Sequence, residues 1–365
     1  KNGEPEPHPE LSVRVEGSRK NRKPAQEQNV IVTAVTDANG NYAIPNVTTF
    51  ASYSLKASKQ DYAFSPQRRL YFNLATNQTN ADFTGTLQIP RSDFDGDGGS
   101  DIAVWRPSDG VWHVRRSADN SYGALQFGGE AFGDAAVPGN YDGDRQTDYA
   151  VYRNGVWYIR QSTNAVVLVK QFGLAGDKPV AGDYDGDGKT DLAVWRPSDR
   201  VWYIWRSSDG GYDFRQFGLE GDTPLAGDYD ADGKTDITIW RPSTGVWYVR
   251  LSSNGDYRAY QFGVNGDVPL VGDFDGDKMA DYTIFRPSTG VWYVALSSNG
   301  GFKILQWGMN GDIPVPADFD RDGKTDFGVF RPAEGDWYVF KSSTNTYVIQ
   351  HFGANGDVPV PAAYR

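Results

Sequence analysis

Cysteine is absent from the 365-residue sequence, which excludes disulfides, zinc–thiolate sites and catalysis by a thiol. Histidine is almost as scarce, and only His8, His113 and His351 could supply an imidazole. No apolar run approaches the roughly 18 residues that a membrane-spanning helix needs. The chain begins at Lys1 rather than Met, so we expect a processed or trimmed chain in which no signal peptide can be read.

Positive charge is in deficit, because 36 Lys and Arg residues are set against 47 Asp and Glu residues. The net charge of −11 argues against nucleic acid and anionic lipid as partners. Aromatic residues are plentiful, at 14%, which is enough to bury a large core and excludes an acidic disordered chain. The 42 Gly and 20 Pro favour many turns and short elements, as in an all-β protein.

Six copies of one unit of about 45 residues follow one another from residue 93 onward. Their central tryptophans fall 45 residues apart, at Trp112, Trp157, Trp202, Trp247, Trp292 and Trp337. Copy three predicts four short strands, at 191–196, 201–206, 212–217 and 225–227.

Four strands per copy are typical of a propeller blade. We therefore predict that residues 89–365 form a six-bladed β-propeller, and that the last segment of the chain lies against blade one. An open solenoid is the alternative.

Each copy opens with an acidic loop of the pattern D-x-D-G-D-G-x-x-D. Carboxylates at positions 1, 3, 5 and 9, a carbonyl at position 7 and a glycine turn at position 6 suit the oxygen coordination of Ca²⁺. The pattern differs from an EF-hand, because position 12 of copy three is Val194 instead of Glu and a strand follows the loop. The sequence therefore predicts calcium loops on β-hairpins, with up to six calcium ions, one per blade.

The predicted ligands occupy positions 1, 3, 5, 7 and 9 of the six loops. They are Asp93, Asp95, Asp97, Gly99 and Asp101; Asn140, Asp142, Asp144, Gln146 and Asp148; Asp183, Asp185, Asp187, Lys189 and Asp191; Asp228, Asp230, Asp232, Lys234 and Asp236; Asp273, Asp275, Asp277, Met279 and Asp281; and Asp318, Asp320, Asp322, Lys324 and Asp326. Copy two has Asn140 as its first ligand, so we expect it to bind calcium most weakly. Copy five has Lys278 where the turn calls for glycine.

Asp-Gly runs also form ordinary solvated turns, which is the alternative interpretation. However, four carboxylates within nine residues repel one another unless a cation lies among them. The loops contain 23 of the 47 acidic residues, so six dications would offset the net charge. We interpret the acidity as a set of metal ligands rather than as a recognition surface.

These repeats resemble the FG-GAP/VCBS family of calcium-binding propeller repeats, through DYDGDGKTDLAVWRPS and QFGLEGDTPLAGDYD. The resemblance covers residues 93–365. It implies an extracellular propeller whose loops bind calcium, of a kind found in adhesins, lectins and surface proteins, and it does not by itself imply catalysis.

Two other residues recur once per copy. They are the arginines Arg106, Arg153, Arg196, Arg241, Arg286 and Arg331, and the aspartates Asp134, Asp177, Asp222, Asp267, Asp312 and Asp357. They predict a ring of ion pairs between neighbouring blades, with a ligand site as the alternative. No Ser, His and Asp set and no Glu pair stands out, so an enzyme is not expected.

Some aromatic residues follow the repeat and others depart from it. The Trp-Tyr strand of each copy is expected in the core between blades, and His113 and His351 occupy repeat positions as packing variants. Trp205 and Trp307 depart from the repeat, and unrepeated exposed aromatics are the better candidates for binding a sugar.

Residues 1–88 predict a small β-sandwich, with strands at 11–16, 29–36, 41–44, 53–58, 70–74 and 81–84. A hairpin turn is predicted at Asp37–Gly40. Through TDANGNYAIPNV, DYAFSP and NADFTGT, this region resembles carboxypeptidase regulatory-like and related Ig-like domains. Such domains usually have one more strand before the turn at Asn2–Pro5. Either the chain is trimmed there, or a neighbouring subunit supplies the strand.

Together these features predict a secreted or cell-surface protein of bacterial origin with a structural or adhesive role. Its expected partners are proteins, including other copies in a filament or sheath, or glycans. The alternative function is a lectin-like propeller that binds carbohydrate through aromatic residues on its face.

Overall fold

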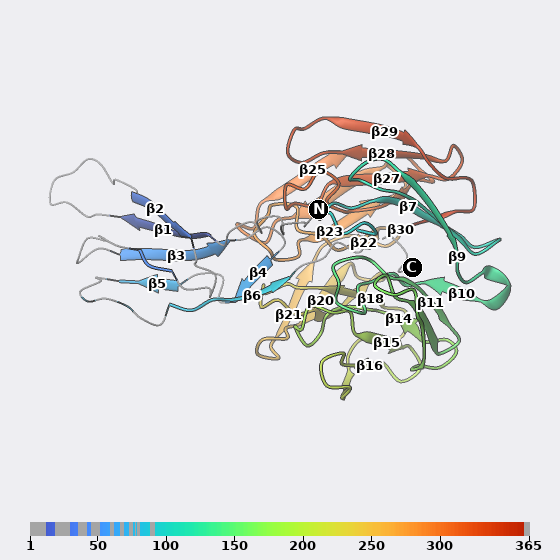
Figure 1. Cartoon of the computed structure of the whole chain (residues 1–365), viewed down its shortest axis with the longest axis horizontal. Coiled ribbons are helices and arrows are strands. Elements are labelled where there is room, and N and C mark those ends of the chain that lie inside the picture. The colour runs from blue at the N-terminus through green and yellow to red at the C-terminus, as the bar shows by residue number, and fades with distance from the viewer. Residues whose placement is uncertain are drawn as a thin grey trace, which may run out of the picture. The chain divides into compact units, whose positions relative to one another are not determined.

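The computed structural model describes residues 12–18, 30–35, 42–44, 52–58, 62–65, 69–72, 76, 78, 81–87 and 92–360. The chain forms two compact units, one with residues 1–88 and the other with most of residues 89–365, and each has its own strands (Figure 1). A 3-10 turn at Glu130–Phe132 is the one helical element within the described ranges. None of the helical structure described there is long and apolar enough to cross a membrane.

The larger unit is a ring of six four-stranded antiparallel sheets, which confirms the six-bladed β-propeller (Figure 1). From the innermost to the outermost strand, blade one consists of β30 (Val358–Val360), β7 (Ile102–Arg106), β8 (Val111–Arg115) and β9 (Tyr122–Gln126). Blade two consists of β10 (Asp134–Ala136), β11 (Tyr149–Arg153), β12 (Val156–Arg160) and β13 (Val167–Gln171), and blade three of β14 (Lys178–Pro179), β15 (Leu192–Arg196), β16 (Val201–Trp205) and β17 (Tyr212–Gln216).

The other three blades repeat this order. Blade four consists of β18 (Thr223–Gly227), β19 (Asp236–Arg241), β20 (Val246–Arg250) and β21 (Tyr257–Gln261). Blade five consists of β22 (Val268–Leu270), β23 (Tyr282–Arg286), β24 (Val291–Ala295) and β25 (Phe302–Gln306), and blade six of β26 (Ile313–Pro314), β27 (Phe327–Arg331), β28 (Asp336–Phe340) and β29 (Tyr347–His351).

The sheets are offset by one strand from the sequence copies. The fourth strand of copy three, β18, pairs with β19 of copy four rather than with its own copy. The reason is that the acidic loop is the hairpin connection between these two strands, so it joins strands of one sheet. The last strand of the chain, β30, pairs with β7, so it lies against blade one as predicted, but it is part of that blade's sheet and not of blade six.

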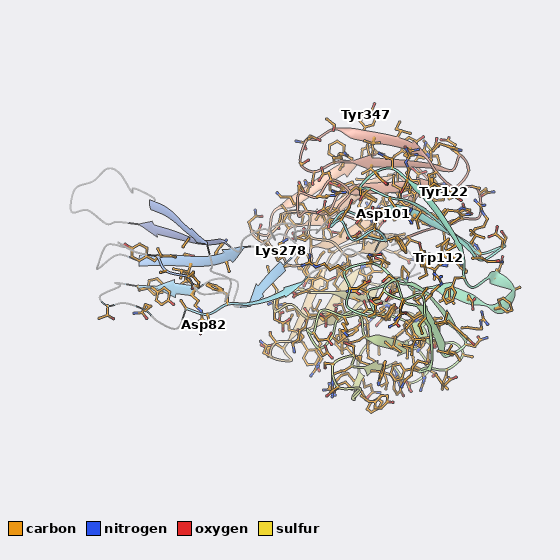
Figure 2. All side chains as sticks on the ribbon, in the orientation of Figure 1. Asp82, Asp101, Trp112, Tyr122, Lys278 and Tyr347 are labelled. Atoms are coloured by element: carbon orange, nitrogen blue, oxygen red, sulfur yellow. The ribbon has the colours of Figure 1, made fainter. Side chains whose placement is uncertain are left out.

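The core lies between adjacent blades. The six central tryptophans are fully buried, and each packs with residues of a neighbouring blade, as Trp112 does with Ala136 and Val151. The outermost strands are exposed, and Tyr122 and Tyr347 have 59% and 60% of their surface accessible (Figure 2). The predicted place of the Trp-Tyr strand in the core between blades is therefore confirmed for its tryptophans.

The smaller unit contains a sheet in the order β2 (Val30–Val35), β1 (Ser12–Ser18), β3 (Ser52–Ser58) and β5 (Arg69–Tyr71), and a pair of β4 (Tyr62–Ser65) and β6 (Thr84–Leu87). The sequence missed β4 and placed β6 too early. Residues 42–44 form no strand, although Tyr42 and Ile44 pack on the buried Tyr53 and Leu55. Their apolar alternation reflects this packing and not a ladder of hydrogen bonds. The turns predicted at 2–5 and 37–40 lie outside the described residues.

Candidate metal centres

The acidic loops connect the innermost strand of each blade to the second strand. In blade three, β14 ends at Pro179, the loop spans 183–191, and β15 begins at Leu192. An isolated bridge between Gly182 and Asp191 closes this loop at its base. The pattern of carboxylates thus sits on a β-hairpin, as the sequence predicted, and the two strands of this hairpin belong to one sheet.

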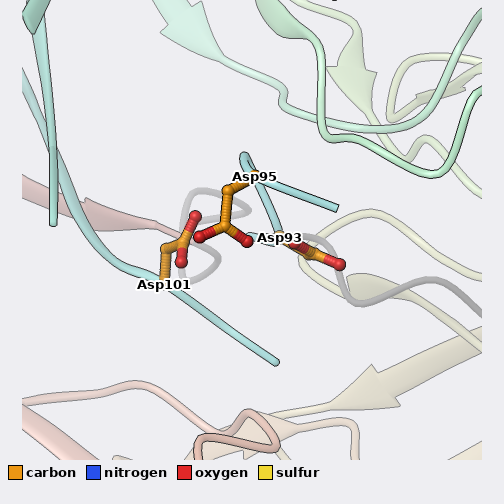
Figure 3. Close-up of side chains that lie close together, drawn as sticks. All are labelled: Asp93, Asp95 and Asp101. Carbon is orange, nitrogen blue, oxygen red and sulfur yellow. The ribbon is translucent and has the colours of Figure 1, made fainter. Parts of the chain in front are cut away.

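Five loops bring together the carboxylates of positions 1, 3 and 9. In each of them, one oxygen from every carboxylate lies within 4.8 Å of the others, an arrangement that could hold a metal ion. Figure 3 shows loop one, in which the carboxylates of Asp95 and Asp101 face one another beside Asp93. The five clusters are Asp93, Asp95 and Asp101; Asp183, Asp185 and Asp191; Asp228, Asp230 and Asp236; Asp273, Asp275 and Asp281; and Asp318, Asp320 and Asp326.

Burial makes these carboxylates costly to ionise. Asp101 and Asp93 have 0% and 2% of their surface accessible, and burial raises the pKa of Asp93 to about 7 and that of Asp101 to about 6. Burial likewise raises the pKa of Asp191 and of Asp326 to about 7. A cation among the carboxylates would favour their charged form, which is the form that a hard metal requires.

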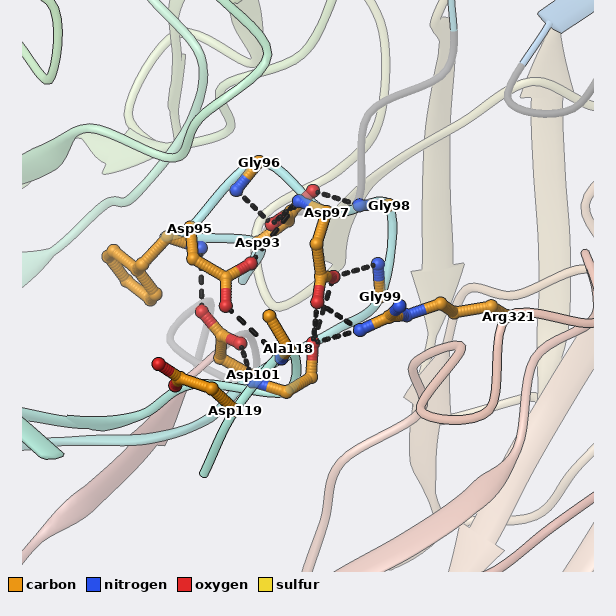
Figure 4. Close-up of polar contacts among 12 residues, drawn as sticks. Asp93, Asp95, Gly96, Asp97, Gly98, Gly99, Asp101, Ala118, Asp119 and Arg321 are labelled. Atoms are coloured by element: carbon orange, nitrogen blue, oxygen red, sulfur yellow. Dashed lines mark hydrogen bonds and ion pairs between the residues drawn. The ribbon is translucent and has the colours of Figure 1, made fainter. Parts of the chain in front are cut away.

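Backbone amides fix the shape of each loop. In loop one, Asp93 accepts the N–H groups of Gly96 and Gly98 at 2.6 and 2.9 Å (Figure 4). Asp101 accepts the N–H groups of Phe94 and Ser117 at 2.8 and 2.7 Å. The loop is therefore held from within and from the turn between β8 and β9, so its carboxylates are arranged in advance of any ligand.

The carboxylate of position 5 lies outside the clusters of three. In loop three, Asp187 accepts the hydroxyl of Ser207 at 2.8 Å and the N–H of Lys189, the position-7 residue, at 2.8 Å. The position-3 carboxylate of Asp185 accepts the hydroxyl of Ser208 at 2.6 Å. The Ser-Ser turn between the two outer strands thus contacts the site, which the sequence reasoning missed although this turn recurs in the repeat. The roles of positions 5 and 7 as ligands stay predictions.

Copies two and five show how departures from the pattern are accommodated. Asn140 accepts the N–H of Gly143 at 2.8 Å, so the turn is kept while one negative charge is lost. Lys278 has φ of +74°, close to the +84° of Gly188 at the same position of loop three. Its N–H donates to Asp273 at 2.8 Å, as the glycines at this position of loops one, three and six do to their first aspartates. The turn of copy five is therefore intact, but a residue other than glycine adopts the left-handed backbone conformation there.

A closed ring of backbone hydrogen bonds links the six loops. In each loop, the N–H of position 8 donates to the carbonyl of position 1 in the loop of the preceding blade. The bonds run from Ser100 to Asp318, Thr147 to Asp93, Thr190 to Asn140, Thr235 to Asp183, Ala280 to Asp228 and Thr325 to Asp273, at 2.6–2.8 Å. Each candidate metal centre is therefore in direct contact with both neighbouring centres.

The repeated arginines and aspartates form six ion pairs at the opposite end of the sheets. Each pair lies within one sheet, as Arg153 and Asp134 do at 2.6 Å on β11 and β10. The predicted ring of pairs is therefore present, but its placement between neighbouring blades was wrong because the sheets are offset from the copies. The remaining pairs are Arg106–Asp357, Arg196–Asp177, Arg241–Asp222, Arg286–Asp267 and Arg331–Asp312, at 2.7–2.9 Å.

The aromatic residues that depart from the repeat have packing roles. Trp205 and Trp307 are both half-buried, and their indole N–H groups donate to the carbonyls of Gly210 and Tyr338. They are therefore not the exposed sugar platform that the sequence suggested. His351 is exposed and pairs with Asp336 at 2.7 Å.

Comparison with known proteins supports the repeat and the fold. Residues 183–239, which contain loops three and four, match the FG-GAP-like repeat family. No curated protein matches the sequence. Among solved structures, TolB from Acinetobacter baumannii is similar with a TM-score of 0.52 and 14% identity, over 86% of this chain and 80% of that chain.

Two further structures are similar at lower scores. An Agrocybe aegerita lectin, described as recognising non-reducing terminal N-acetylglucosamine, has a TM-score of 0.47 and 14% identity, over 73% of this chain and 96% of that chain. Virginiamycin B lyase from Staphylococcus aureus has a TM-score of 0.43 and 9% identity, over 70% of this chain and 85% of that chain. The similarity to TolB, at so low an identity, shows the propeller fold alone.

Proposed function

We propose that the propeller binds calcium in its acidic loops and that the ions have a structural role. The observation that carries this proposal is the recurrence of three converging carboxylates in five loops. Calcium is preferred over magnesium because the ligands are all oxygens on curled backbone, and Ca²⁺ tolerates the flexible, higher coordination that such loops offer. The predicted sixth site, in copy two, would be the weakest because Asn140 lacks a charge.

Bound calcium would stabilise the ring in two ways. It would neutralise carboxylates that burial makes costly to ionise, and it would rigidify loops that already bond to their neighbours across every pair of blades. An ion that binds only the folded state contributes roughly 2.7 kcal/mol per site at 100 times its Kd. Several such sites on one ring would therefore provide the cross-links that a chain without cysteine lacks.

Thermal melting of metal-stripped protein tests this proposal directly. We expect the melting temperature to rise steeply with added calcium and much less with the same concentration of magnesium, and we expect metal analysis to find at least five calcium ions per chain. A melting curve that is indifferent to chelation, or an equal shift with magnesium, would contradict the proposal.

We further propose that the protein acts outside the cell or on the cell surface, in a structural or adhesive role. The match to FG-GAP-like repeats supports this, and millimolar calcium is available to weak loops in that compartment. Within the described part of the smaller unit, β2 and β5 are the edges of the four-stranded sheet. An edge strand can accept a strand from another chain, which would permit assembly into filaments. Electron microscopy of the purified chain in calcium would show filaments if this is correct and single particles if it is wrong.

A further inference from the structure

Blade one lacks a contact that all other blades have. In the other five, the arginine of the ion pair lies over the tyrosine of the Trp-Tyr strand, with 4.3–4.7 Å from the guanidinium carbon to the ring centroid. In blade one, His113 replaces that tyrosine. Arg106 donates from Nε and Nη2 to Asp357, and its Nη1 has no partner in the part of the chain that the structure describes. In blades four to six, this nitrogen donates to the tyrosine hydroxyl at 2.9–3.3 Å.

A second donor next to Arg106 is also unpaired. Trp105 is 3% exposed, and its indole N–H has no acceptor among the described residues. The equivalent indoles of Trp195 and Trp240 donate to the carbonyls of Phe217 and Phe262 at 3.1 and 3.2 Å.

Copy one differs from those copies by two extra residues after Phe127. They lengthen the connection that contains the 3-10 turn at Glu130–Phe132, and among the described residues the indole that donates to the carbonyl of Phe127 is that of Trp112 and not that of Trp105. The unpaired indole of Trp105 therefore occurs in the copy that carries the insertion.

These unpaired donors belong to residues that line a pocket of about 660 Å³ in the propeller. The inserted turn supplies Glu130 as one wall, and the first residues of β10 and β30 supply others. Ile313 and Pro359 add apolar surface. This volume is in the range of about 300–1,000 Å³ that is typical of small-molecule sites.

We propose that this pocket binds a neutral saccharide. Arg106 and Trp105 offer donors without an acceptor among the described residues, and the exposed carboxylate of Glu130 offers an acceptor. A sugar hydroxyl both accepts and donates, and the apolar C–H face of a sugar ring matches Ile313 and Pro359. A saccharide could then pair with the donors of Arg106 and Trp105 and with the carboxylate of Glu130.

Charge favours a neutral ligand over an ionic one. Asp134 and Asp357 line the pocket but are already paired with Arg153 and Arg106, and Glu130 adds one uncompensated negative charge. An anion would be repelled by the uncompensated carboxylate of Glu130, and a cation would leave the donors of Arg106 and Trp105 unpaired. Carbohydrate would then bind in a pocket lined by the insertion of copy one, and not on exposed aromatic residues.

The test is saturation-transfer NMR and calorimetry of the full calcium-loaded chain with glucose, galactose, mannose, N-acetylglucosamine and their disaccharides. Three variants accompany the wild type. Glu130→Ala removes the acceptor, and Glu220→Ala is the matched control on the equivalent exposed connection of copy three. His113→Tyr restores the residue of the other five copies, so it should cover Arg106 and supply the missing partner of Nη1.

We expect at least one of these saccharides to bind the wild type and Glu220→Ala equally. Glu130→Ala and His113→Tyr should each lower the affinity at least tenfold, and His113→Tyr should melt no lower than the wild type. The absence of saturable binding by the wild type, or equal affinity in all variants, would overturn the proposal. Stronger binding of glucuronate or glucosamine than of glucose would overturn the choice of a neutral ligand.

The saccharide proposal can be tested independently of the calcium proposal. The pocket lies at the end of the sheets that carries the ion pairs, whereas the acidic loops lie at the other end. Saccharide binding should therefore persist in chelator at temperatures where circular dichroism shows a folded chain. Loss of binding under those conditions, in a protein that remains folded, would contradict the assignment of the pocket.

Discussion

Arg106 and Asp357 form a bidentate ion pair, at 2.7 and 2.9 Å, between residues 251 positions apart in the chain. The equivalent pairs in the other five blades join residues only 19 positions apart. The Arg106–Asp357 pair stands beside the pairing of β30 with β7, so it is the side-chain part of the closure that turns a row of blades into a ring.

Removing Asp357 should therefore open the ring locally. We expect Asp357→Ala to destabilise the propeller by about 2–4 kcal/mol, because the aspartate is fully buried while the arginine is partly exposed and can regain water. Asp222→Ala, in the equivalent pair of blade four, is the matched control with a similar loss of stability. Hydrogen exchange separates the two variants, since only Asp357→Ala should accelerate exchange in both β30 and β7. Equal protection of these strands in the two variants would show that the pair has no special role in closure.

Copy two offers a gain-of-function test of the metal loops. Asn140→Asp restores the fourth aspartate in a loop whose turn is already formed, so it should strengthen calcium binding at this loop and raise the melting temperature in calcium. Asn140→Ala removes the side-chain oxygen and should weaken the same site. Native mass spectrometry and calorimetry would count the ions. If both variants bind the same number of ions as the wild type with the same affinity, loop two is not a metal site.

The repeat made most of the propeller predictable. A period of 45 residues, four short strands and a terminal strand left over at Val358–Val360 suffice to place six blades and to close them on β7. The central tryptophans were predictable as core because each alternates with less buried neighbours on a strand, as Trp202 does in β16. These features depend on local periodicity, which a single sequence contains.

Features that depend on contacts between copies were harder to predict from the sequence. The hydrogen bond from Thr190 to Asn140 joins two loops through backbone atoms, and no side-chain pattern encodes it. Because the sheets are offset from the copies, Arg153 and Asp134 pair within one blade. The repeat alone had suggested a pair between two neighbouring blades. In the smaller unit, Tyr42 and Ile44 alternate like a strand because they face a core, yet they form no ladder.

The stability of the calcium-free protein should depend on pH with a definite sign. Burial raises the pKa of Asp191 and of Asp326 to about 7, well above the value of about 3.9 in an unfolded chain. Between these values the folded state retains protons that the unfolded state has released, so the contribution of these groups to stability is lost as pH rises from about 4 to about 7.

Metal-stripped protein should therefore melt at a lower temperature at pH 7.5 than at pH 5.5, and saturating calcium should abolish or reverse this difference. Asp191→Asn is the matched variant, because it removes one titrating group and should flatten the calcium-free profile. Melting temperatures that rise with pH in stripped buffer would contradict this account of the buried carboxylates.

The strained turn of copy five provides a test of loop geometry that does not depend on the metal. Lys278 has φ of +74°, which costs an L-residue about 1 kcal/mol relative to glycine. We expect Lys278→Gly to stabilise the protein by about 0.5–1 kcal/mol in urea unfolding at constant calcium, since its N–H can still donate to Asp273. Lys278→Ala removes the same charge but keeps the strain, so it should give no such gain. The reverse change, Gly188→Lys in loop three, should cost about as much as Lys278→Gly gains, and equal stability of all three variants would show that backbone strain at this position is negligible.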